Sequence, residues 1–334
     1  MQMKILSLAK YALTITTSAA LLAACGNNGG SSLAPSGAAA GPTGIAHVGR
    51  AVMLNGVLVT AAHPNLAAQK PVRSHPAKSM KSGFYQYISD FGSDTILEFD
   101  YPKGDAQIGS IAGGGGECTR NGRGTFWVAA SSELEEFKVG GTSPIRVLKP
   151  GGESCAIDQA SGDIATPISS GGIIIFRHGR GKGKVYYGSG LIEAFFAGYD
   201  DSGNLFLDGF SDGGAFGLVE LPKGSSTFET ITVSNSVEFP GAVQWDGKYL
   251  TVGDQENHVI YRYAVSGTMA TLKGTVSLRG SSDCDQTWIA KTLVFCPDAG
   301  NIDVEVYKYP TGGYPTATLT GSFTEPIAAV QVAK

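Results

Sequence analysis

The sequence predicts an all-β protein, a six-bladed β-propeller closed by pairing of the C-terminal strand with the first blade. Three observations predict this fold. One strand-like segment recurs six times from Phe84 onward, its copies follow one another at about 38 to 44 residues, and each copy is followed by further strand-like segments. This period is typical of propeller blades. Closure of the ring removes the free sheet edges that an open array would expose.

The recurring segment is a β-branched or aromatic stretch that follows a Gly or Lys turn. Its copies are residues 84–88, 125–128, 163–166, 204–207, 248–252 and 292–295. A second segment ends on a large apolar residue, and most copies alternate between apolar and polar residues, which predicts one inward and one outward face. Its copies are residues 96–99, 134–137, 173–176, 218–221, 260–263 and 306–309.

Two more segments complete each repeat. The third follows turns that contain glycine, which suit tight reversals of the chain. Its copies are residues 108–111, 145–148, 184–187, 228–233, 275–278 and 316–319. The fourth is rich in small residues, as expected of a strand that is crowded near a propeller axis. Its copies are residues 118–122, 155–159, 194–199, 241–245, 284–289 and 327–332. The last of these is the C-terminal strand that would complete the first blade.

The stretch from Phe239 through Pro240 and Gly241 to Asp246 and Gly247 resembles the frame of NHL-type propeller repeats. The resemblance covers residues 84–334 and implies a fold, because propellers host enzymes, receptors and scaffolds alike. Two other folds agree less well with the repeats. A right-handed β-helix would need shorter coils, and a two-sheet β-sandwich would not repeat six times.

The N-terminus predicts export. Residues 1–24 combine two lysines, a mostly apolar stretch and a small-residue ending typical of a signal peptide. The ending Leu22-Ala23-Ala24-Cys25 resembles the bacterial lipobox, which implies lipidation of Cys25, a palmitate-type anchor and a place in the cell envelope. An ordinary secretory signal with an incidental cysteine is the alternative. Gly26 stands where an aspartate would resemble an inner-membrane retention signal, which favours the outer membrane.

Charge divides the remaining chain into a basic tether, residues 25–83, and an acidic body, residues 84–334. All 29 acidic residues lie at or beyond Asp90, whereas 18 of the 25 basic residues lie beyond Phe84, which gives the body a net charge of about −11. Residues 26–43 are mostly Gly, Ser, Ala and Pro, the composition of a flexible spacer. The acidic body argues against nucleic acid as a partner, since phosphates require a basic surface.

Four cysteines remain after Cys25, and an even number in an exported chain favours two disulfides. Cys118 and Cys155 fall near the starts of consecutive innermost strands, where a disulfide would join two blades. Cys284 and Cys296 lie symmetrically about Ala290, the centre of a predicted hairpin. Structural disulfides are preferred over metal ligation or a reactive thiol, because the acidic neighbours Glu117 and Asp283 would raise a thiol pKa.

An acidic residue stands close to the start of every innermost strand. These residues are Glu117, Glu153, Glu193, Glu238, Asp283 and Glu325. In a closed ring they could converge on one mouth of the channel and attract Ca²⁺, another divalent cation or an organic cation. The positions are not all equivalent, and a slip of one residue reverses a side chain in a strand. Solvated loop acids are therefore the alternative interpretation.

Catalytic motifs are scarce. His178 and His258 each stand in or beside a predicted turn of a different blade, which leaves little for a His-based triad or metal site. Glu238, before Pro240 and Trp245, loosely resembles the first metal-binding stretch of gluconolactonase-type propellers. That resemblance implies a divalent-metal hydrolase, but the glutamate lies in the fifth repeat and no asparagine partner is found.

Aromatic residues offer a possible ligand platform, although packing between blades explains them equally well. They are Tyr186, Tyr187, Phe195, Phe196, Tyr199 and Phe206. The preferred function is a non-catalytic binding or scaffolding module anchored to the membrane by lipid, with an envelope protein or a carbohydrate as ligand. A divalent-metal-dependent hydrolase or lyase is the alternative.

Overall fold

The computed structural model describes residues 51–54, 57–60, 83–120, 122 and 124–333. The predicted signal peptide, Cys25 and most of the predicted tether lie outside the described residues. Within the described part, the regular elements are strands, apart from one short 3-10 helix, η1 (Arg177–Gly179). No helix in this part is long and apolar enough to cross a membrane. The predicted all-β class is confirmed.

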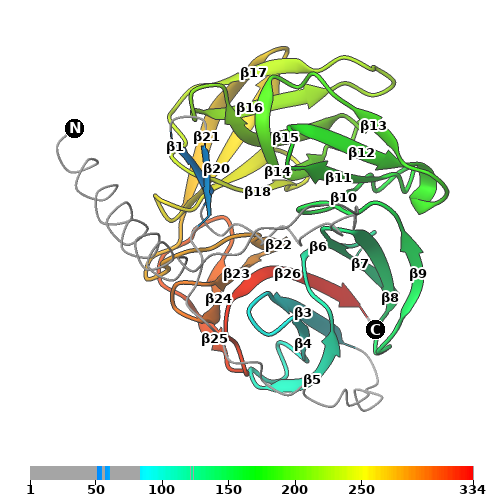
Figure 1. Cartoon of the computed structure of the whole chain (residues 1–334). Coiled ribbons are helices and arrows are strands. Elements are labelled where there is room, and N and C mark those ends of the chain that lie inside the picture. Colours follow the sequence, from blue (N-terminus) through cyan, green and yellow to red (C-terminus); the bar gives the residue numbers. More distant parts are fainter. Residues whose placement is uncertain (1–50, 55–56, 61–82, 121, 123, 334) are drawn as a thin grey trace, which may run out of the picture. The chain divides into compact units, whose positions relative to one another are not determined.

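The strands form sheets whose order follows the chain (Figure 1). A two-stranded sheet within the predicted tether contains β1 (Ala51–Leu54) and β2 (Val57–Thr60). The next sheet has the order β26 (Pro326–Ala333), β3 (Phe84–Asp90), β4 (Thr95–Phe99), β5 (Gln107–Ala112). It is followed by β6 (Gly116–Cys118), β7 (Thr125–Ala130), β8 (Glu133–Lys138), β9 (Pro144–Leu148). A third contains β10 (Ala156–Ile157), β11 (Ile164–Ile168), β12 (Gly172–Phe176), β13 (Lys184–Tyr186).

An eight-stranded sheet follows, made of two antiparallel four-stranded groups. The first group is β14 (Leu191–Tyr199), β15 (Leu205–Ser211), β16 (Phe216–Leu221), β17 (Glu229–Val233). The second is β18 (Pro240–Trp245), β19 (Leu250–Asp254), β20 (Val259–Ser266), β21 (Met269–Ser277). The last strands of the two groups, β17 and β21, pair in parallel through Thr232 with Met269 and Val233 with Ala270. The final sheet is β22 (Trp288–Ala290), β23 (Leu293–Asp298), β24 (Asp303–Lys308), β25 (Ala317–Leu319).

The C-terminal strand β26 pairs antiparallel with β3, from Ala333 opposite Phe84 to Pro326 opposite Asp90. The first strand of each four-stranded group also contacts the first strand of the next group. These contacts run from β26 to β6, β10, β14, β18, β22 and back to β26. In Figure 1 these first strands lie toward the interior of the drawing, whereas β5, β9, β17 and β25 lie toward its periphery.

Strand β4 is buried on both faces, which differs from the expectation of one inward and one outward face, whereas β20 has partly exposed residues between its buried ones. Ile96 and Leu97 are neighbours on β4 and point to opposite faces, yet neither is more than 1% exposed. Ile96 packs in a cluster with Phe126 of the following sheet, and Leu97 packs in a cluster with Val304 of the preceding one. A second sheet therefore covers each face, and alternation along the strand decides which neighbouring sheet a side chain meets.

Three first strands have other bounds than the sequence predicts. Strand β6 overlaps the predicted segment 118–122 only at its last residue. Strand β10 covers two residues of the segment 155–159, and β22 begins only at the last two residues of the segment 284–289. Polar side chains replace part of the missing ladder: the Gln159 amide donates to the Thr119 and Ile157 carbonyls, at 3.2 and 3.1 Å. A pattern of small residues does not show whether the backbone or polar side chains supply the hydrogen bonds of such a segment.

Candidate functional site

A cavity of about 350 Å³ lies among the first strands of the sheets, and we call it the first-strand cavity. Its wall comes from β6, β10, β14, β18 and β22. In four of these strands the wall includes the final residue, which is Cys118, Ile157, Tyr199 or Trp245. The volume lies within the range of pockets that hold small molecules or single side chains.

Glu117 of β6 lines this cavity and is fully buried. The Ser89 hydroxyl donates to its Oε1 at 2.8 Å, and its Oε2 has no hydrogen-bond partner. Burial raises the pKa of the Glu117 carboxyl well above its usual range, an effect that the Ser89 hydrogen bond only partly offsets. The carboxyl is therefore enclosed by the protein, and one of its oxygens accepts no hydrogen bond.

The Gln286 side chain forms hydrogen bonds with both backbone polar groups of Glu117. The Glu117 N–H donates to Gln286 Oε1 at 2.8 Å, and Gln286 Nε2 donates to the Glu117 carbonyl at 2.9 Å. The Gln286 N–H itself donates to the Ile327 carbonyl of β26, at 2.9 Å. One amide side chain therefore joins β6 to the segment before β22. A second amide acts in the same way, since Gln244 and Ile289 exchange bonds of 3.2 and 2.9 Å.

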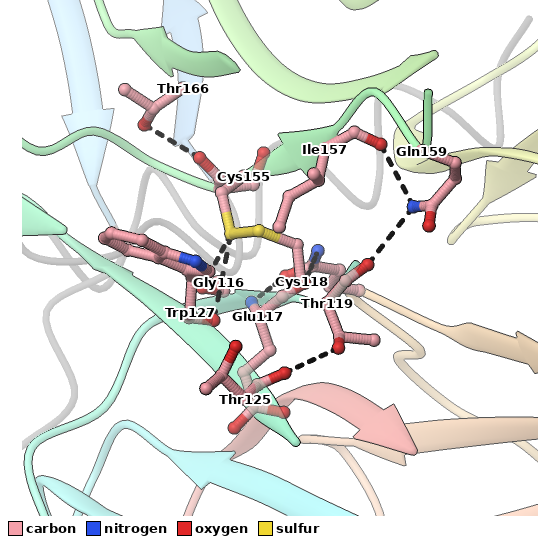
Figure 2. The surroundings of a disulfide bond; sticks show 12 residues. Gly116, Glu117, Cys118, Thr119, Thr125, Trp127, Cys155, Ile157, Gln159 and Thr166 are labelled. Atoms are coloured by element: carbon pink, nitrogen blue, oxygen red, sulfur yellow. Dashed lines mark hydrogen bonds between the residues drawn. A yellow bond between two sulfur atoms is a disulfide. The ribbon is translucent and has the colours of Figure 1, made fainter. Parts of the chain in front are cut away.

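The Cys118–Cys155 disulfide forms part of the cavity wall and joins β6 to the start of β10 (Figure 2). Its Cα atoms are 5.6 Å apart. Figure 2 also shows the Gln159 amide reaching Thr119 and Ile157 beside the disulfide. The predicted connection between consecutive sheets is confirmed, and it fixes the geometry of the wall next to Glu117.

Aromatic and acidic residues also line the first-strand cavity. Tyr199, Trp245 and Trp288 line it, together with Asp200 and Asp201. Among the described lining residues there is no lysine, arginine or histidine. Of the aromatic residues that the sequence offered as a ligand platform, Tyr199 lines this cavity. Phe195, Phe196 and Phe206 instead pack in a hydrophobic core, as the packing alternative predicted.

The acids before the first strands are positioned by a repeated aspartate that the sequence reasoning missed. Asp90, Asp254 and Asp298 end the second strands β3, β19 and β23. Asp90 and Asp254 face the first residues of β26 and β18, and Asp298 faces Cys284 in the segment before β22. Each carboxylate accepts two successive backbone N–H groups of the loop before that strand. The donors are Thr324 and Glu325 for Asp90, Glu238 and Phe239 for Asp254, and Ser282 and Asp283 for Asp298.

This register shows which of the predicted acids are equivalent. Glu325 and Asp283 both occupy the second donor position of the loop, whereas Glu238 occupies the first, and Phe239 holds the second. Glu238 is exposed, while Asp283 and Glu325 are half-buried. A slip of one residue therefore separates Glu238 from the position that Asp283 and Glu325 share.

The other acids approach one another. Burial raises the pKa of Glu153 to about 7, with a further contribution from the charge of Glu193, and burial raises the pKa of Glu193 to about 7 as well. Burial also raises the pKa of Asp285 well above its usual range, and the charges of Asp283, Glu325 and Glu153 add to this effect. These acids form one cluster, and none of them is among the residues that line the first-strand cavity.

Two members of the acidic neighbourhood, Asp208 and Asp285, were missed by the sequence reasoning. Asp208 is fully buried and accepts the Phe196 N–H at 3.0 Å, where β14 bulges against β15. Burial raises its pKa well above the usual range, and the charge of Asp285 contributes. The sequence does contain a signal for Asp208, because it stands within the otherwise apolar segment 205–211. A buried acid in such a strand requires a polar partner.

The acids do not form a compact metal centre. Among the described residues, the group whose potential ligand atoms all lie within 4.8 Å of one another is Cys284, Cys296 and Asp298. The two cysteines form the second predicted disulfide, with Cα atoms 5.2 Å apart, so their sulfurs are not available as thiolates. The pairing is confirmed. The hairpin itself is centred between Ala290 and Leu293 rather than on Ala290.

His178 lies in η1 and His258 lies in the turn before β20, with positive φ angles of 51° and 52°. Nδ1 of the exposed His178 lies 2.7 Å from the carbonyl of Ser161, in the turn between β10 and β11. Neither histidine lines the first-strand cavity. Each therefore occupies the turn position that the sequence indicated.

Comparison with known proteins relates the chain by fold and not by sequence. No family model matches it, and no curated protein matches it. A solved structure described as a nidogen/laminin complex contains a similar chain, with a TM-score of 0.61 and 12% identity over 75% of this chain and 98% of that one. The fold of this protein is a β-propeller.

Proposed function

We propose that this chain is a non-catalytic binding module of the bacterial cell envelope, and that it receives a protein partner at the first-strand cavity. The observation that carries the proposal is the cavity itself, of about 350 Å³, which is formed by the first strands of several sheets. Its lining combines aromatic rings, amides and carboxyls. Concave sites of this volume are typical of ligand binding.

We also propose that the propeller has six blades and that β26 closes it. Two observations support this. The first strands contact one another in a circuit that returns to β26. Each hydrophobic cluster also joins one four-stranded group to the next, for example Trp127 with Ile174 and Val304 with Leu97. The eight-stranded sheet then counts as two blades whose outermost strands β17 and β21 have paired.

A protein is the preferred kind of partner. The similar chain of known structure belongs to a protein complex, that of nidogen with laminin, which fits a propeller that binds another protein. The predicted lipid anchor on Cys25 and the spacer after it would hold the module at the envelope surface, with the outer membrane favoured.

Pull-down from detergent-solubilised envelope tests the binding proposal. The full chain should recover a protein partner, and Asp201→Arg, which reverses a charge at an exposed position of the cavity, should reduce recovery at least fivefold. Asp212→Arg, an exposed acid in the β15–β16 turn, is the matched control and should recover the partner normally. Recovery of no partner above background, or equal losses in both variants, would contradict the proposal.

Cys25→Ala tests the anchor separately. The native chain should incorporate radiolabelled palmitate and fractionate with membranes, and the variant should lose the label and appear in the soluble fraction. Membrane fractionation that is unchanged in Cys25→Ala would overturn the lipoprotein assignment without touching the binding proposal.

A further inference from the structure

We propose that the turn between β12 and β13 docks on an anionic lipid surface and binds the phosphate groups of its headgroups. We call residues 177–184 the basic turn, and its charged side chains are Arg177, Arg180, Lys182 and Lys184. The inference uses no residue of the first-strand cavity. The choice of a lipid surface rests on the proposed place of the chain in the cell envelope.

The basic turn is an exception within the acidic body. Residues 164–192 contain these four basic residues and no acidic residue, so four of the 18 basic residues of the body lie within eight consecutive positions. Exposed charges are screened over about 10 Å in ordinary salt. A local patch of this kind therefore attracts phosphate, although the body as a whole is acidic.

The four cations are accessible. All of their side chains are exposed, and none forms an ion pair with another residue in the part of the chain that the structure describes. Asp163 does contact the turn, but its Oδ1 accepts the His178 N–H at 2.8 Å. The guanidinium and ammonium groups of the turn are therefore available to phosphate oxygens, which they bind through charge-assisted hydrogen bonds.

A glycine between the two lysines sets their direction. A Cβ at Gly183 would lie 2.3 Å from Ile174 Cγ2 and 2.9 Å from Phe176 Cε1, so the backbone at this position packs directly on the core of the sheet. Neighbouring residues of an extended segment point to opposite sides. Because Gly183 faces the core, Lys182 and Lys184 point away from it, in agreement with their exposure.

The basic turn is also held in a fixed conformation. The Arg180 N–H donates to the Arg177 carbonyl at 3.1 Å, which closes the turn. The guanidinium of Arg146, on β9 of the preceding sheet, donates to the Gly179 carbonyl at 3.1 Å. Two neighbouring sheets therefore position the backbone that carries the cations, which reduces the entropy lost when a ligand binds.

Apolar side chains beside the basic turn favour a lipid surface over other phosphate-bearing partners. Val185 and Tyr187 follow the cations directly and are 38% and 66% exposed. They lie in and just after β13, which is the last strand of its sheet. Tyrosine is enriched at membrane–water interfaces, and basic residues bind anionic headgroups there. A nucleic acid offers phosphates but no apolar layer for Val185.

Co-sedimentation with vesicles tests the inference, using the full chain with Cys25→Ala so that no lipid anchor contributes. The probes are vesicles of phosphatidylcholine, vesicles of equal parts phosphatidylcholine and phosphatidylglycerol, and oligodeoxythymidine. We expect at least tenfold tighter binding to the anionic vesicles than to the neutral ones, and loss of this binding in about 0.5 M NaCl. Equal binding to both vesicles, no binding, or tighter binding of the oligonucleotide overturns the inference.

Neutralising the basic turn should weaken binding to the anionic vesicles at least tenfold, because each basic residue near the surface contributes. This variant combines Arg177→Gln, Arg180→Gln, Lys182→Gln and Lys184→Gln. The matched control removes four exposed charges elsewhere and should bind as the parent chain does; it combines Lys248→Gln, Lys273→Gln, Lys291→Gln and Lys308→Gln. Should the first variant fail to fold, Lys182→Glu alone should still weaken binding about threefold. Equal losses in variant and control overturn the role of the turn.

Quenching by brominated lipid locates the contact. Tyr187→Trp and Tyr314→Trp each add an indole at a strongly exposed tyrosine, 66% and 71% exposed, of which only the first is next to the basic turn. On anionic vesicles that contain brominated lipid, the fluorescence that Tyr187→Trp adds should be quenched at least twice as strongly as that of Tyr314→Trp. Equal quenching would mean that the propeller binds the vesicle through another surface.

Failure of this inference is distinguishable from failure of the proposed function. If the native chain incorporates palmitate but the Cys25→Ala chain does not bind anionic vesicles, only the role of the basic turn falls. If vesicles bind but the native chain incorporates no palmitate and recovers no partner, the proposed function falls and the lipid contact stands. Washing membranes with about 0.5 M NaCl should release Cys25→Ala, which separates this contact from the anchor.

Discussion

Buried carboxyls are the most unusual residues of this propeller. Glu117, Asp208 and Asp285 are all less than a tenth exposed, and burial is the largest cause of the raised pKa of each. Acids are rarely buried to this extent unless they are paired. In this chain several of them face other acids, so the native state must hold protons or a bound cation to relieve the repulsion.

Glu193 gives a prediction for the pH dependence of stability. Its pKa is about 7 in the folded chain against an ordinary value of 4.5, so between these values the folded state holds a proton that the unfolded state has lost. The free energy of unfolding therefore falls as pH rises from about 4.5 through 7. Glu193→Gln should reduce this fall by on the order of 1 kcal/mol between pH 5 and 8, after allowance for solvent screening.

Urea denaturation at pH 5 and pH 8 measures this difference. Exposed Glu238→Gln is the control and should retain the native pH dependence. A variant Glu193→Gln that loses as much stability with rising pH as the native chain would show that Glu193 does not titrate in the folded state.

At the scale of elements, the repeated aspartates explain how the loops before the first strands are held. Asp254 accepts the N–H groups of Glu238, Phe239 and Asn257 at 3.0, 3.3 and 3.2 Å, and the Asn257 side chain donates to it at 2.8 Å. Hydrogen bonds to charged groups contribute more than neutral ones. The aspartate thus joins the loop before β18 to the turn after β19.

Asp254→Ala should lower the free energy of unfolding by about 2 to 4 kcal/mol, because it removes the charged acceptor of four part-buried hydrogen bonds. Asp201→Ala, at an exposed position, should cost less than about 0.5 kcal/mol. Chemical denaturation at neutral pH compares them. A loss at Asp254 as small as that at Asp201 would mean that water replaces the carboxylate.

The two disulfides should differ in their contributions to stability. Cys118 and Cys155 are 37 residues apart, and Cys284 and Cys296 are 12 apart. The chain-entropy model gives about 4 kcal/mol for the longer loop and about 3 kcal/mol for the shorter one. The paired serine variants should therefore lose stability in that order, which equilibrium denaturation would detect. The reverse order would indicate that strain or residual unfolded structure outweighs loop entropy.

At the scale of the whole molecule, the C-terminal strand joins the end of the chain to β3, near the start of the repeats. β26 pairs along the whole of β3, and its Ala329, Val330 and Val332 lie in the cores on both faces of this sheet.

Deletion of residues 326–334 should abolish cooperative thermal unfolding and make the chain sensitive to protease, because it exposes β3 as an edge and opens two cores. Deletion of residues 1–43 is the control and should leave the melting temperature within about 2 °C. A truncated chain that still unfolds in one cooperative transition would contradict closure.

The sequence by itself determined the all-β class, the second and third strands of each repeat and both disulfide pairings. These features depend on local alternation, on turn residues and on the spacing of cysteines, all of which can be read along the chain. Trp127 and Tyr263, for example, lie in strands at the expected places.

Only the tertiary structure decided the bounds of the short first strands, the parallel pairing of β17 with β21, and which acids come together. Glu238 was misplaced and Asp285 was missed because their positions depend on one residue of register and on the approach of strands from different repeats. Gln286 shows the reason most clearly: its side chain bonds to a residue 169 positions away. Contacts of this kind leave no periodic pattern in the sequence, because they are set by packing and not by the local chain.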